Sequence, residues 1–66
     1  MILEDLEYIF KAQVAEGTTN LYFMLIDSDG YKVVERHQLA DIESLVPMLS
    51  SFQYVGHDGR IPRFQK

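Results

Sequence analysis

The chain has 66 residues, of which 47% are hydrophobic, and it contains no cysteine. A chain of this length forms one domain, and the absence of cysteine excludes disulfide bonds and thiolate zinc sites as sources of stability. The net charge of −4 argues against a general nucleic-acid binder, and it is unevenly spread: residues 1–30 sum to −5 and residues 31–66 to +1.

The sequence ILEDLEYIFKAQVA, at residues 2–15, predicts an amphipathic helix. Its apolar side chains recur at helical spacing, and Gln13 or Val14 occupies the last position of the apolar face. Carboxylates crowd the first turns, where the helix dipole favours them. Gly17 then favours the end of the helix, because glycine readily adopts the left-handed conformation that follows many helices.

The sequence LYFMLI, followed by DSDG and YKVVERH, predicts a β-hairpin over residues 21–37. The glycine that ends the turn tolerates a positive φ, which favours a three-residue loop. That loop would pair Leu25 with Val33, and Phe23 with Glu35. A two-residue loop would shift the register by one residue, and the sequence leaves this choice open.

The sequence DIESLVPMLSSF, at residues 41–52, predicts a second helix with one apolar face and Asp41 as its N-cap. Pro47 conflicts with a continuous helix, because proline removes a backbone donor and clashes with the preceding turn. The conflict disappears if Ser44 caps a separate helix over residues 45–52, whose first turn then contains the proline.

The C-terminal sequence QYVGHDGRIPRFQK predicts a short third strand or an ordered coil. Gly56, Gly59 and Pro62 interrupt any long element, and the proline would restrict a strand to an edge of the sheet. Residues 59–66 could also form a flexible tail.

Together these elements predict a small single α+β domain over residues 1–66. Its order is a helix, a β-hairpin and a second helix, with room for a short C-terminal strand, and the helices pack on a small antiparallel sheet.

The first predicted strand is apolar on both faces, which raises the question of what covers the second face. If both helices pack on one face, the other face exposes a surface suited to a protein partner. The interface candidates are then Tyr22, Met24, Ile26 and Val34. The alternative places one helix on each face, which would bury these side chains and leave no such surface.

Two charged regions are further candidates for contact with a partner. The acidic surface candidates, which could block a basic site or simply form a solvated helix face, are Glu4, Asp5, Glu7 and Glu16. The tail candidates, in which arginine and an aromatic ring could stack on bases, are Arg60, Arg63 and Phe64. The alternatives for the tail are a solvated end or contact between its arginines and the acidic helix.

The sequence offers no arrangement typical of catalysis or cofactor binding. The turn DSDG resembles the start of a calcium loop, but the twelfth position is Gln38 rather than the required glutamate. His37 and His57 have acidic neighbours in sequence, which does not by itself make a catalytic pair. No nucleophile elbow or phosphate-binding loop is present. We therefore expect no enzyme activity, metal, cofactor or small-molecule substrate.

The chain shows neither a secretion signal nor an apolar run long enough to cross a membrane, so we expect a soluble cytoplasmic protein without membrane contact. We expect a non-enzymatic interaction module or regulator, comparable in type to the small accessory proteins of bacteriophages and mobile elements. It would form a homodimer through its sheet or bind another protein. The alternative is a regulator of nucleic-acid machinery, acting by direct binding through the arginines and Phe64 or by acidic blocking of a basic site.

Overall fold

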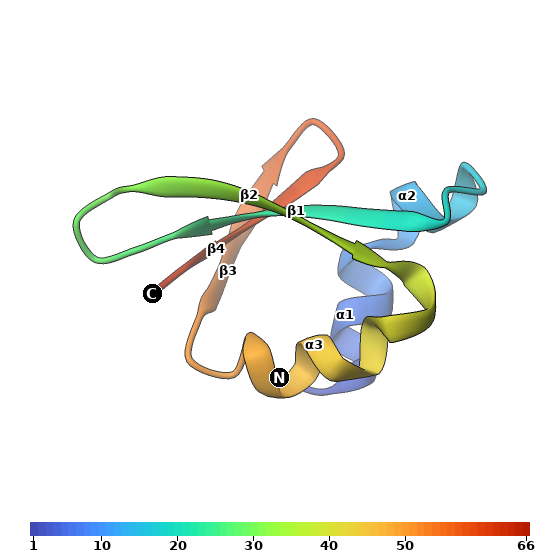
Figure 1. The fold of residues 1–66 in the computed structure, drawn as a ribbon, viewed down its shortest axis with the longest axis horizontal. Helices are drawn as coiled ribbons and strands as arrows, with labels where there is room; N and C mark the ends of the chain where they lie inside the picture. The colour runs from blue at the N-terminus through green and yellow to red at the C-terminus, as the bar shows by residue number, and fades with distance from the viewer.

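The computed structural model describes all residues 1–66 as a single small α+β domain with a four-stranded sheet (Figure 1). In chain order, the elements are α1 (Leu3–Ile9), α2 (Lys11–Ala15), β1 (Asn20–Ile26), β2 (Lys32–Gln38), the 3₁₀ helix η1 (Leu39–Ser44), α3 (Leu45–Met48), β3 (Gln53–Asp58) and β4 (Ile61–Gln65). The α+β class predicted from the sequence is confirmed. No helix is long and apolar enough to cross a membrane.

The strand order in the sheet is β2-β1-β4-β3. The pairs β1–β2 and β3–β4 are antiparallel, whereas β1 and β4 are parallel. The sheet is therefore mixed, and the prediction of a small antiparallel sheet is wrong on this point. The reason is that the C-terminal segment forms a second hairpin, and its last strand pairs with β1 from a distant part of the chain. Residues 59–66 thus supply a loop and an interior strand.

The first hairpin has the register predicted for a three-residue loop. Leu25 pairs with Val33 and Phe23 with Glu35. Gly30 ends the loop with a φ of 85°, a backbone conformation that residues with a side chain adopt only at a cost in free energy. Asp27 holds the loop together, because its Oδ1 accepts hydrogen bonds from the backbone N–H groups of Asp29 and Tyr31.

The helices are shorter than predicted. The N-terminal helix is divided at Phe10, whose ψ of 6° departs from helical geometry. In the second helical region η1 leads into α3, and Pro47 lies in the first turn of α3, as the alternative required. The expected side-chain cap by Asp41 is absent. The hydroxyl of Ser44 instead donates to the carbonyl oxygen of Asp41, at 2.6 Å.

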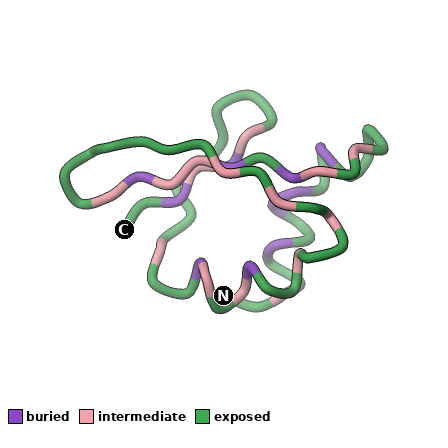
Figure 2. The backbone as a smooth tube through the Cα atoms, viewed as in Figure 1, coloured by how far each residue is buried: buried purple, intermediate pink, exposed green.

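The helical segments α1 and α3 lie on the same side of the sheet (Figure 1). The buried positions lie mainly where these helices and the strands face each other (Figure 2). Phe23 lies at the centre of this core, in edge-to-face contact with Phe10 and Phe64 at centroid distances of 5.9 and 6.0 Å. The eight residues of the core cluster are Leu6, Ile9, Phe10, Leu21, Phe23, Leu45, Leu49 and Phe64.

The parallel ladder between β1 and β4 stops abruptly at a proline. At one end of the ladder, the N–H of Lys66 donates to the carbonyl oxygen of Ile26, at 2.9 Å. Counting back in the same register places the N–H of position 62 opposite the carbonyl oxygen of Tyr22. Pro62 has no N–H, so the ladder cannot continue there.

The side chain of Gln13 fills the place of the missing ladder bonds. Its Nε2 donates to the carbonyl oxygens of Tyr22 and Arg60, at 2.8 and 2.9 Å. Its Oε1 accepts from the N–H of Tyr22, at 2.9 Å. A buried amide thus replaces a peptide group between two strands, which explains how a proline fits into an interior strand.

Candidate functional site

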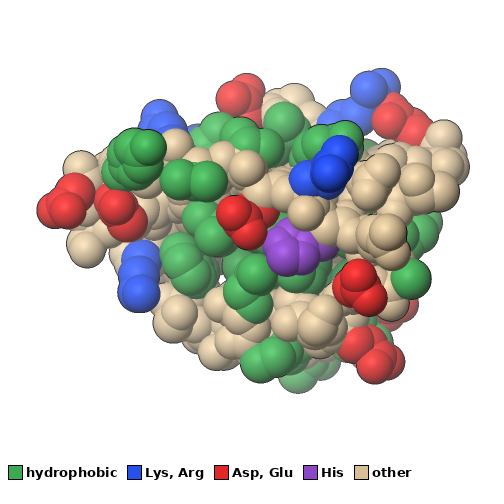
Figure 3. Space-filling view, viewed as in Figure 1, with side chains coloured by type: hydrophobic (Ala, Val, Ile, Leu, Met, Phe, Trp, Pro, Cys, Tyr) green, Lys and Arg blue, Asp and Glu red, His purple; other side chains and the backbone are tan.

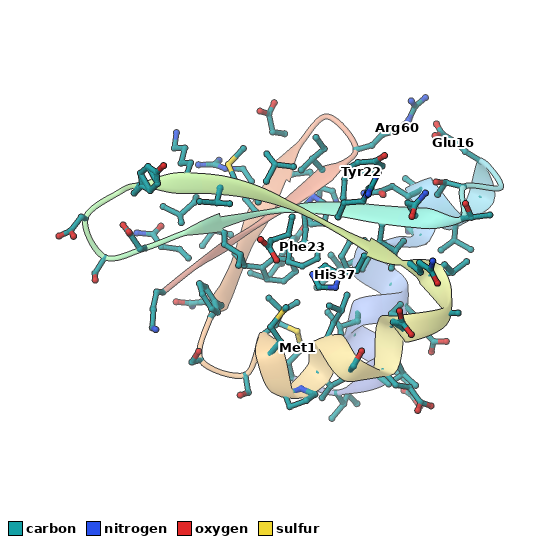
Figure 4. The ribbon with its side chains drawn as sticks, viewed as in Figure 1. Met1, Glu16, Tyr22, Phe23, His37 and Arg60 are labelled. Atoms are coloured by element: carbon teal, nitrogen blue, oxygen red, sulfur yellow. The ribbon has the colours of Figure 1, made fainter.

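The two faces of β1 have different surroundings. Leu21 and Phe23 point towards the helices and are fully buried, whereas Tyr22 on the opposite face is 40% exposed. Figure 4 shows Tyr22 directed away from the side on which Phe23 and His37 lie. The arrangement with both helical regions on one face is therefore the one observed, and the other face of the sheet lacks a helical cover.

We call the uncovered surface the open face. Strand register and alternation assign its residues, because partners in a ladder point to the same side. Its apolar members are Tyr22, Met24, Ile26, Val34, Val55 and Ile61. Its charged members are Lys32, Arg36, Arg63 and Asp58.

The four predicted interface residues all lie on the open face, but they differ in exposure. Val34 is 53% exposed, Tyr22 is well exposed and Met24 is half-buried. Ile26 is only 4% exposed and lies outside the main core cluster. The accessible apolar surface therefore depends on Val34 and Tyr22, with Met24 between them.

The basic residues of the open face were not predicted as part of this surface. Arg36 pairs across the strands with Tyr22, and Arg63 pairs with Met24. The signal was present in β2, where positions 32, 34 and 36 share a face once the register is known. The position of Arg63 could not be inferred in this way, because it depends on the long-range pairing of β4 with β1.

More than half of the acidic residues lie in the helical segments or directly beside them. Residues 1–17 and 39–48 contain six of the ten acidic residues and a single basic residue, Lys11. The carboxylates of α1 and η1 are exposed, and Figure 3 shows acidic side chains over the helical side, with further acidic side chains at the end of the β1–β2 hairpin and near the histidine. The molecule thus has an acidic helical layer and a basic, partly apolar sheet face.

The predicted acidic candidates are only partly brought together. Glu4, Asp5 and Glu7 share α1 and are exposed. The carboxylate of Asp5 accepts a hydrogen bond from the N–H of Ile2, at 3.0 Å, which stabilises the first turn. Glu16 lies apart from them and forms a salt bridge with Arg60.

The predicted tail site does not exist as a unit. Phe64 is fully buried in the core, where it contacts Phe23, so it cannot stack on a base. Arg60 is bound to Glu16, as one alternative for the tail expected. Arg63 is half-buried on the open face. The expectation failed because successive side chains of a strand point to opposite faces, so that Phe64 points into the core and Arg63 points to the open face.

The two histidines have structural contacts. His37 stacks on Phe23 at a centroid distance of 5.3 Å, and its Nε2 lies 3.2 Å from Glu35 Oε1. His57 Nε2 lies 3.0 Å from the carbonyl oxygen of Ile9. Because a carbonyl only accepts, this nitrogen carries the proton, and His57 links β3 to the end of α1. No group of three or more His, Cys, Asp or Glu side chains is placed to hold a metal ion.

Comparisons with protein-family models, with curated proteins and with solved structures give no match for this chain. Its own geometry is therefore the basis for a functional proposal.

Proposed function

We propose that this protein is a non-enzymatic interaction module that binds a protein partner through the open face of its sheet. The observation that carries the proposal is the exposure of Tyr22 and Val34 on a face that no helix covers. Tyrosine, methionine and arginine are enriched in protein interfaces, and all three occur together here.

The composition of the open face describes the surface it would bind. Three cations, Lys32, Arg36 and Arg63, surround apolar side chains, and Asp58 is the one carboxylate on this face. A complementary partner has an apolar patch with acidic groups around it, because like charges across an interface oppose binding.

Two adjacent valines in β2 provide a matched test. Val34 lies on the open face and is 53% exposed, whereas Val33 points to the helical side near the tip of the hairpin and is 42% exposed. Affinity capture from the native cell, with quantitative mass spectrometry, would compare the wild type with Val34→Glu and Val33→Glu. We expect the amount of the specific partner captured by Val34→Glu to be at least about tenfold lower than the amount captured by the wild type. Val33→Glu should capture as much as the wild type. Equal retention by both variants, each folded by circular dichroism, would exclude the open face as the interface.

A second candidate is single-stranded nucleic acid on the same face. It is favoured by the cross-strand pair of Tyr22 and Arg36, since aromatic rings and guanidinium groups both stack on bases. Fluorescence anisotropy with a labelled oligonucleotide would detect such binding. We expect it to weaken steeply with salt and with Arg36→Ala if this candidate is right. Binding that is absent at low salt would eliminate it.

A further inference from the structure

We propose that the open face docks onto the helical layer of a second copy of this chain, so that copies associate head to tail. By the helical layer we mean the outer surface of α1, α2, η1 and α3. The inference rests on the proposed function of the open face and names its partner.

Charge decides between the two ways in which copies can meet. A symmetric dimer of two open faces would press together two surfaces that each carry three cations, Lys32, Arg36 and Arg63, and a single carboxylate, Asp58, so the net charges of the two faces repel. The helical layer instead offers exposed carboxylates on α1 and η1 to these cations. The members of this acidic set are Glu4, Asp5, Glu7, Asp41 and Glu43.

The helical layer also offers apolar surface. Tyr8 on α1 is 69% exposed, and Ile2 before α1 is 58% exposed. A groove of about 510 Å³ runs between α1 and the start of β3, where Tyr8, Phe52 and Tyr54 are among its mainly hydrophobic walls and Asp5 contributes a carboxylate. Exposed apolar side chains of an open face, such as Val34, therefore find both apolar contacts and opposite charge on this layer.

The size of the open face limits how much surface the association can bury. The molecule measures 34 × 23 × 16 Å, and in Figure 1 α1 and α3 lie beneath β1 and β2 along the intermediate direction, while β3 crosses these strands and descends towards α3. The open face is thus on the order of 500 Å², below the roughly 800 Å² per partner of a standard stable interface. We expect weak association, and a head-to-tail contact of this kind builds open chains or rings rather than a symmetric dimer.

Two double variants test the arrangement by sedimentation velocity over a range of protein concentrations. The double variant Lys32→Glu/Arg36→Glu reverses the charge of two residues on the open face. The double variant Glu7→Lys/Glu43→Lys reverses the charge of two residues on the helical layer. All four residues are exposed and form no salt bridge, so both variants should remain folded. Urea unfolding monitored by circular dichroism would verify this.

We expect the wild type to show a concentration-dependent increase in mean mass that high salt reduces, because salt screens exposed charges. The association constant of each variant alone should be at least about tenfold lower than that of the wild type. An equimolar mixture of the two variants should associate again, because opposite charges then face each other. A strictly monomeric wild type at about millimolar concentration would overturn the inference while leaving a different protein partner for the open face. Association that survives in the helical-side variant but not in the sheet-side variant would also overturn it, in favour of contact between two open faces.

Discussion

The amide of Gln13 should be one of the most sensitive positions in the protein. Its side chain is 5% exposed and makes three hydrogen bonds to the backbone of Tyr22 and Arg60. In Gln13→Leu the volume is nearly retained, but one N–H and two carbonyl groups lose their partners. Each lost hydrogen bond costs about 1 kcal/mol, and a stranded buried group raises that cost to about 1–3 kcal/mol. We therefore expect a loss of about 3–5 kcal/mol in the free energy of unfolding.

This loss is large for so small a domain, whose total stability is expected to be about 3–10 kcal/mol. Each kcal/mol corresponds to about 4–8 °C in Tm at this size, so the melting transition should fall by at least about 12 °C. Gln13→Glu should also be strongly destabilised at neutral pH, because the introduced carboxylate would face two carbonyl oxygens and keep only the bond from the N–H of Tyr22. Lowering the pH should recover part of its stability, since protonation removes the charge and restores one donor.

Thermal and urea unfolding followed by circular dichroism would measure these changes. Gln38→Leu is the matched control, because Gln38 is exposed in β2 and its side chain makes no hydrogen bond within the protein. The control should change the free energy of unfolding by less than about 0.5 kcal/mol. A Gln13→Leu variant within about 1 kcal/mol of the wild type would refute the view that this amide replaces the broken ladder.

Substitutions at three further positions test the rest of the fold. Phe64→Ala should lower the free energy of unfolding by about 3–5 kcal/mol, because Phe64 is fully buried. Circular dichroism should then show much of the chain unfolded at room temperature. A cooperative transition near that of the wild type would contradict the central position of β4. His57→Phe keeps a ring but removes the hydrogen bonds of His57 to the carbonyl oxygen of Ile9 and to the hydroxyl of Tyr54. We expect a loss of about 1–2 kcal/mol in urea unfolding, and an unchanged midpoint would show that both bonds are unimportant for stability. Asp27→Ala should lower the free energy of unfolding by about 1–2 kcal/mol. Asp27→Asn should lower it much less, because asparagine retains the acceptor for the N–H of Tyr31. Equal losses in the two variants would show that the charge of Asp27 matters instead.

The features that the sequence predicted correctly are those determined by neighbouring residues. The first hairpin follows from alternation and from the glycine at the end of the turn, and its observed register is the three-residue-loop option of the two that the sequence left open. The position of Pro47 in the first turn of α3 follows from the backbone geometry that proline requires. In both cases the information lies within a few residues of the structure that it specifies.

The features that the sequence could not supply depend on pairing between distant segments. Nothing local indicates that β4 pairs with β1 rather than forming an edge, and Pro62 argues against it. The solution lies in Gln13, a polar residue on an otherwise apolar helix face. Its position could be read from the helical spacing, but its partners exist only after α2, β1 and the second hairpin have come together. For the same reason, Phe64 was expected at a surface and is found in the core.

The separation of the two faces has a consequence for how binding could change without loss of the fold. Almost all of the core lies between the helices and the inner side of the sheet, and Ile26 is the one fully covered apolar side chain of β1 on the outer side. Tyr22 and Val34 are already in contact with water in the isolated chain, so their replacement by polar residues removes little buried apolar surface. The residues that hold this domain together and those proposed to bind its partner are thus largely different sets. Substitutions of Tyr22 and Val34 should consequently alter association with little change in stability, which is the behaviour that distinguishes a binding surface from an incompletely covered core.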